Sequence, residues 1–177
     1  MTGPEFSRPV RLDTLGEQPR PMKVVAAPDE RSALAARFGL IALDRLDAEL
    51  SLSRKGDEIA VHGTLQAAVI QACVASGMPV PAALAAPFDL LFRPQLAAGH
   101  ADEEIELNER EMDVVFYEGG EIDVGEAVAE TLSLSLDPWP RAPEADVALR
   151  AAGVKREGEE ENGPFAALAG LKDKLRP

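Results

Sequence analysis

The chain has 177 residues, of which 46% are hydrophobic and 5% aromatic, and its formal net charge is −13 at pH 7. This length suffices for one domain with a core of its own, built from aliphatic side chains because aromatic ones are scarce. The acidic balance disfavours tight binding to naked nucleic acid, whose affinity comes largely from lysine and arginine, and favours basic partners.

The first half of the chain predicts strands and one helix. Residues 28–39 carry the helix signals: Pro28 suits its first turn, and Gly39 suits the left-handed conformation that ends many helices. Alternation of apolar and polar residues predicts strands over 6–15, 22–27, 46–53, 59–67 and 81–94. The turn at 54–57 contains Gly56, so 46–67 is expected to form a hairpin.

Between these strands and the next helix lies a strongly acidic segment, residues 98–111. It holds six acids and one arginine from Asp102 to Glu111. Because its apolar surface is too small to offset the entropy of ordering, we expect a mobile loop.

The clearest element is the helix that starts after Asp123. Asp123 is expected to be its N-cap, with Glu126 completing a capping box. Val124, Val128 and Leu132 recur every four residues and predict one buried stripe. Pro138 predicts that the helix ends near residue 136, and its outer face carries Glu126 and Glu130.

These elements predict an α+β domain over residues 6–147, with an antiparallel sheet that is curved or barrel-like and two or three helices. Residues 148–163 are charged and Gly-rich and predict a disordered linker. Residues 164–175 predict a short helix at the end of a flexible tail. Its stripe of Phe165, Leu168 and Leu171, with Lys172 beside it, either docks on a partner or packs on its own domain.

Catalytic and metal-binding patterns are scarce. His62 and His100 are the two histidines, and neither belongs to a base–nucleophile pattern. No Gly-rich phosphate loop appears, and the single cysteine, Cys73, makes an intrachain disulfide impossible. We therefore expect a non-enzymatic protein without cofactor or metal. The first residues lack a secretory leader and no apolar run is long enough for a membrane helix, so we expect it in the cytoplasm, away from membranes.

The order of segments resembles the YceD family, the large ribosomal RNA subunit accumulation proteins. The resemblance spans Val10 to Lys172 and rests on QACVAS (71–76), PFDLLF (87–92), EIDVGEAVAETLSLSLDPWP (121–140) and PFAALAGLK (164–172). Many relatives carry two cysteine pairs, of which only Cys73 is present here, so the metal site of those relatives is not expected. The resemblance implies structural roles for Cys73, Asp123, Glu126 and Glu130.

The function that this resemblance implies is support of 23S ribosomal RNA accumulation and ribosome assembly. The charge suggests contact with a basic ribosomal protein or a large-subunit assembly intermediate, through Phe165, Leu168, Leu171 and Lys172 as the partner-binding segment. Two alternatives stay open. One is direct RNA binding by a basic stripe, and the other is a small hydrolytic enzyme with a pocket of convergent polar groups. The residues proposed for the stripe are Arg8, Arg11, Arg20 and Lys23.

Overall fold

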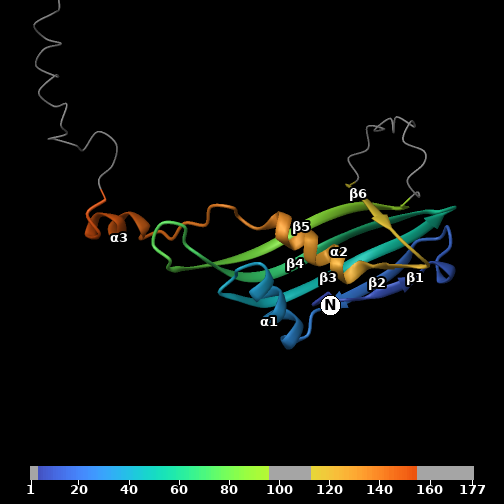
Figure 1. Ribbon diagram of the computed structural model, residues 1–177, viewed down its shortest axis with the longest axis horizontal. Helices are drawn as coiled ribbons and strands as arrows, with labels where there is room; N and C mark the ends of the chain where they lie inside the picture. Colours follow the sequence, from blue (N-terminus) through green and yellow to red (C-terminus); the bar gives the residue numbers. More distant parts are fainter. Residues whose placement is uncertain (1–3, 96–112, 155–177) are drawn as a thin grey trace, which may run out of the picture.

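The computed structural model describes residues 4–95 and 113–154. Within these ranges the chain forms an α+β fold with three α-helices and a sheet of five strands in the order β2-β3-β4-β5-β6 (Figure 1). The elements are β1 (Pro9–Arg11), a 3-10 turn η1 (Leu12–Thr14), β2 (Arg20–Val25), α1 (Pro28–Arg37), β3 (Ala42–Lys55), β4 (Glu58–Ala72), β5 (Pro79–Pro94), β6 (Asp113–Tyr117), β7 (Glu121–Asp123), α2 (Val124–Ser135) and α3 (Ala145–Ala151).

The predicted antiparallel sheet is confirmed for most of its strands. Strands β2 to β5 form a meander in which every neighbouring pair is antiparallel. The hairpin between β3 and β4 turns at Gly56, whose φ of 64° lies in the left-handed region that glycine adopts without strain. Strand β6 departs from the prediction because it pairs with β5 in parallel, with Leu90 opposite Asp113.

The prediction of a curved or barrel-like sheet was wrong. The edge strands β2 and β6 do not pair with each other, and the sheet is neither closed nor curled (Figure 1). A barrel hides its core by closing the sheet, whereas here helices α1 and α2 and the two-stranded β1–β7 sheet pack against one face. This second layer buries the apolar face, so closure is unnecessary.

The core lies between that face of the sheet and α2. The predicted stripe of α2 is confirmed, since Val124, Val128 and Leu132 are all almost completely buried. They pack in one cluster with inward-facing strand residues such as Leu65 of β4 and Phe92 of β5. Burial of such side chains contributes about 1.5–3 kcal/mol each to folding.

The opposite face of the sheet is not covered by any described helix, and it mixes charged side chains with exposed apolar ones such as Val25 and Phe116. Cross-strand ion pairs tie its side chains together. Lys23 binds Glu49 at 3.0 Å and Arg93 binds Glu58 at 2.9 Å. The His62 side chain is exposed, as the sequence predicts. Its ring lies 2.6 Å from the Asp89 carboxylate.

Helix α1 confirms the predicted start at Pro28 and the end at Gly39, whose φ is 65°. Glu30 Oε2 accepts a hydrogen bond of 2.7 Å from the backbone N–H of Ala27. Its carboxylate also receives two hydrogen bonds from the Arg8 guanidinium, at 2.7 and 2.8 Å. The Arg8 guanidinium holds the pKa of Glu30 below its usual value.

The start of α2 confirms Asp123 as the N-cap and corrects the predicted role of Glu126. Asp123 accepts hydrogen bonds from the backbone N–H groups of Gly125 and Glu126, at 2.9 and 3.2 Å. The Glu126 carboxylate does not form the reciprocal bond of a capping box. It binds Arg37 at the end of α1 instead, at 2.6 Å, and so joins the two helices.

Several predictions differ from the structure or fall outside it. The strand expected over 6–15 stops at Arg11, because the chain then turns through η1 and Leu12 N–H bonds the Gly120 carbonyl at 2.9 Å. Helix α3 includes 148–151, the first residues of the expected linker, where alanines favour helix. Residues 152–154 of the expected linker are described and follow α3. The expected acidic loop 98–111, the rest of the linker from 155 and the segment 164–175 lie outside the described residues.

Candidate functional site

Three adjoining hollows, two of them lined by α2 and the third by the turn before β7, together form what we call the α2 groove. The upper hollow, about 440 Å³, lies between α2 and strands β5 and β6. It shares Val115, Ala127 and Glu130 with a middle hollow of about 310 Å³. The middle hollow shares Tyr117, Glu118 and Glu121 with a lower hollow of about 790 Å³ at the turn before β7. Neighbouring hollows therefore adjoin at shared residues.

The floor of the α2 groove is apolar. Alternate residues of β5 point to the inner face, so Phe88, Leu90 and Phe92 all line it. Val115 adds a side chain from β6. Leu134, near the end of α2, also lines the upper hollow although its side chain is 83% exposed. The floor therefore continues into an apolar side chain that nothing in the described residues covers.

The rim of the α2 groove is acidic. Asp113 opens β6, Glu118 follows β6, and Glu130 lies on the exposed face of α2. None of these three carboxylates forms an ion pair with another described residue. The residues described as lining the upper and middle hollows include no lysine or arginine. The local potential is therefore negative.

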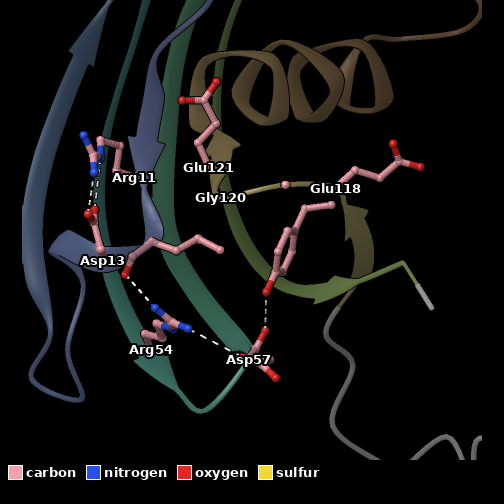
Figure 2. Close-up of a pocket in the computed structure, with 10 residues that line it drawn as sticks. Arg11, Asp13, Arg54, Asp57, Glu118, Gly120 and Glu121 are labelled. Carbon is pink, nitrogen blue, oxygen red and sulfur yellow. Dashed lines mark hydrogen bonds and ion pairs between the residues drawn. The ribbon is translucent and has the colours of Figure 1, made fainter. Parts of the chain in front are cut away.

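The lower hollow contains two arginines, and both are bound by the chain itself. Figure 2 shows Arg11 beside Asp13 and Arg54 directed toward Asp57. The ion pair of Arg11 with Asp13 measures 2.5 Å. The Arg54 guanidinium donates to the Leu12 carbonyl at 2.9 Å and lies 3.5 Å from Asp57. These contacts occupy the cations, so the lower hollow offers no unpaired arginine to an anion.

The Gly119–Gly120 turn lines the lower hollow, beside the residues that this hollow shares with the middle one. Gly119 has a φ of 81°, which a glycine adopts without strain. Tyr117, just before the turn, donates its hydroxyl to the Asp57 carbonyl at 2.9 Å and so connects β6 to the β3–β4 hairpin. In Figure 2 Glu118 and Glu121 extend from this turn in different directions.

Carboxylates and an apolar floor set the chemistry of the α2 groove. A base–nucleophile pair needs side chains within hydrogen-bond reach, and the groove's polar side chains are mainly carboxylates with Tyr117 and Thr131. Among residues 4–95 and 113–154, no group of three or more His, Cys, Asp or Glu side chains is placed to hold a metal ion. An apolar floor with an acidic rim suits a cationic, partly apolar ligand.

The structure brings some of the predicted site residues to this groove. Glu130 belongs to its rim, and Asp123 and Glu126 line its middle part, where their carboxylates serve the helix cap and Arg37. The proposed partner-binding residues Phe165, Leu168, Leu171 and Lys172 lie outside the described residues. Sequence analysis missed Asp113, Glu118 and Tyr117, although the double glycine between a strand and a helix start was a visible signal of a turn there.

Cys73 lies in a separate small cluster with Ala142 and Ala145, and is 3% exposed. The backbone N–H of Ala142 donates to its Sγ at 3.3 Å, and this hydrogen bond is the main cause that lowers the pKa of the thiol to about 7. The contact ties the end of β4 to the segment after α2. The structural role of Cys73 stays a prediction.

The four residues of the proposed basic stripe do not form one basic face. Arg20 and Lys23 occupy positions of opposite parity on β2 and therefore point to opposite faces of the sheet. Carboxylates neutralise three of the four. Arg8 binds Glu30, Arg11 binds Asp13 and Lys23 binds Glu49.

Comparison with known proteins gives the family. The described part of this acidic chain forms an α+β fold with a groove beside α2, and none of its described helices has the length and apolar character to cross a membrane. The family model described as "Large ribosomal RNA subunit accumulation protein YceD" matches residues 61–172. This match covers more than half of the sequence, and the chain belongs to the YceD family. Neither curated proteins nor solved structures gave a match.

Proposed function

We propose that this protein is a non-enzymatic cytoplasmic factor that supports accumulation of 23S ribosomal RNA during ribosome assembly. Membership of the YceD family implies a role in accumulation of the large-subunit RNA. The finer proposal is that the protein acts through contacts with a basic ribosomal protein or with a large-subunit assembly intermediate, and does not grip the naked RNA.

The observation that carries this proposal is that most described cations are paired with carboxylates, whereas carboxylates such as Asp113, Glu118 and Glu130 have no described cation as a partner. The described cations that form ion pairs with described carboxylates are Arg8, Arg11, Lys23, Arg37, Arg45, Arg54, Arg93 and Arg141. Phosphate binding needs such cations free to displace counterions from the nucleic acid. With a net charge of −13, the chain suits a basic protein better than a polyanion.

The open face of the sheet gives direct RNA binding no further support. Sheets that read single-stranded RNA stack bases on aromatic side chains of a central strand and surround them with cations. At the centre of this face lie Thr64 and Gln66 of β4, beside the cross-strand pair of His62 and Asp89. Its phenylalanine, Phe116, is at the β6 edge.

The C-terminal residues Phe165, Leu168, Leu171 and Lys172 form the second part of the proposal. Helical spacing places the three apolar residues on one face, and Lys172 suits the end of such a helix. We propose that this segment docks on the assembly partner, while the chain that precedes it raises its local concentration near the folded domain.

The double change Phe165→Ala and Leu168→Ala tests this part. We expect it to abolish co-sedimentation of the full chain with large-subunit precursors while the melting temperature stays nearly unchanged, because the segment contacts the partner and not the core. Val147→Ala with Val154→Ala is the matched control, since both side chains are exposed on or after α3. A double variant that melts several degrees lower shows instead that the segment packs on its own domain.

A further inference from the structure

We infer that the α2 groove is the docking surface for a basic protein segment that carries apolar side chains. This inference rests on the proposed function and specifies which surface of the folded domain the basic partner contacts.

The shape and the floor of the groove favour a segment of polypeptide over a small molecule. Two of the hollows follow α2 from Leu134 toward its first turn, and the third adjoins them at the Gly119–Gly120 turn, which gives an elongated and open surface in place of an enclosed pocket. Its floor offers Phe88, Leu90 and Val115 between the secondary-structure elements. Alternate or helically spaced apolar side chains of a segment fill such a groove.

The rim selects the charge of the occupant. Asp113, Glu118 and Glu130 line the groove along both β6 and α2, and none of them has a described ion-pair partner. Lysine or arginine side chains of a docked segment can reach these carboxylates while the apolar side chains contact the floor. A nucleic acid does not fit, because its phosphates meet the same carboxylates.

A second copy of this chain is a poor occupant for the same reason. Each copy carries a net charge of −13, so two copies repel each other unless a basic part of one meets the acidic groove of the other. Most described cations are already paired within their own chain. We therefore assign the groove to a separate basic protein.

The experiment measures binding of the full chain to two synthetic peptides of equal length and charge. One alternates lysine with leucine and the other alternates lysine with serine. The groove variant is Asp113→Asn, Glu118→Gln, Glu130→Gln. The control variant is Glu17→Gln, Asp44→Asn, Glu144→Gln, which removes the same charge from exposed positions that do not line the groove.

We expect the groove variant to weaken binding of the lysine–leucine peptide about tenfold or more, and the control variant to weaken it less than about twofold. Leu134→Ser is expected to weaken the lysine–leucine peptide and to leave the lysine–serine peptide unchanged, because only the former uses the floor. Equal losses in the groove and control variants overturn the inference, since the attraction then comes from net charge alone. Equal affinity of the two peptides for the unmodified chain also overturns it.

Two further measurements complete the test. The first separates the groove inference from the proposed function, and the second asks whether the C-terminal cations of the chain itself occupy the groove. If the unmodified chain co-sediments with large-subunit precursors and the groove variant does so equally well, the groove inference fails and the proposed function stands. If the unmodified chain does not co-sediment at all, the proposed function fails. The variant Lys172→Gln, Lys174→Gln, Arg176→Gln reports on the chain's own basic end. If this variant binds the peptide more tightly, and the same three changes give no such gain when they are added to the groove variant, this end occupies the groove, which also overturns the inference.

Discussion

Replacing Gly125 with alanine is expected to lower the free energy of unfolding by about 3 kcal/mol or more. A Cβ atom at this position lies 2.4 Å from the Phe6 carbonyl oxygen and 2.9 Å from the Arg8 backbone nitrogen. Both are main-chain atoms, and Phe6 is completely buried, so neither can move aside cheaply. The alanine forces α2 away from the N-terminal segment that it packs against.

Gly120→Ala is the matched control for this prediction. A Cβ at Gly120 meets no heavy atom within 4 Å, and its φ lies outside the left-handed region. We expect it to change the free energy of unfolding by less than about 1 kcal/mol, as is usual for surface changes. Urea denaturation of both variants measures the difference. Equal stability of Gly125→Ala and Gly120→Ala contradicts the close packing of α2 on Phe6 and Arg8.

Replacing Asp123 with alanine is expected to cost about 2–4 kcal/mol of stability. Its carboxylate accepts from the Ser7 hydroxyl at 2.5 Å and the Arg8 backbone N–H at 2.7 Å, in addition to two N–H groups of the first turn of α2. The change therefore removes the helix cap and leaves the N-terminal segment without its acceptor. Measured by urea denaturation, the loss is expected to be larger than that of an ordinary N-cap, which is about 1 kcal/mol.

Asp137→Ala is the control for Asp123→Ala. The Asp137 carboxylate accepts a single exposed hydrogen bond, from the Trp139 backbone N–H at 2.9 Å. We expect it to cost no more than about 1 kcal/mol. If Asp123→Ala costs as little as Asp137→Ala, the contacts of Asp123 to Ser7 and Arg8 do not stabilise the fold.

Local signals made much of the helical structure predictable. Asp123 as N-cap, the stripe that ends with Leu132 and the start of α1 at Pro28 each depend on residues within one or two turns, and all three are confirmed. The turn at Gly56 was predictable for the same reason, because a tight turn needs a residue of that type at that place.

The contacts between distant segments were not predictable in this way. The Glu126 carboxylate can bind its own helix end or a cation elsewhere, and only the packing of α1 beside α2 brings Arg37 to it. The parallel pairing of β6 with β5 depends on the path of the chain between Pro94 and Asp113. The alternation of residues in a strand does not indicate which strand it pairs with or in which direction. The sequence therefore did not reveal that the sheet stays open or that β6 and α2 border a groove.

The candidate site shows the same limit. Glu130 was identified as an exposed acid of α2, but its place on the rim follows from the position of β6. Glu118 was not singled out, because one more acid is uninformative in so acidic a sequence. Glu118 matters because it lies beside the apolar floor and has no ion-pair partner among the described residues.

The most direct test of the central claim compares two ligands of the unmodified full chain at physiological salt. One is the set of large-subunit ribosomal proteins freed of RNA, and the other is naked 23S ribosomal RNA. The acidic chain and its self-paired arginines predict binding to one or more of the basic proteins and at least about a hundredfold weaker binding to the naked RNA. Binding to the naked RNA that is as tight as binding to any of the proteins contradicts the account.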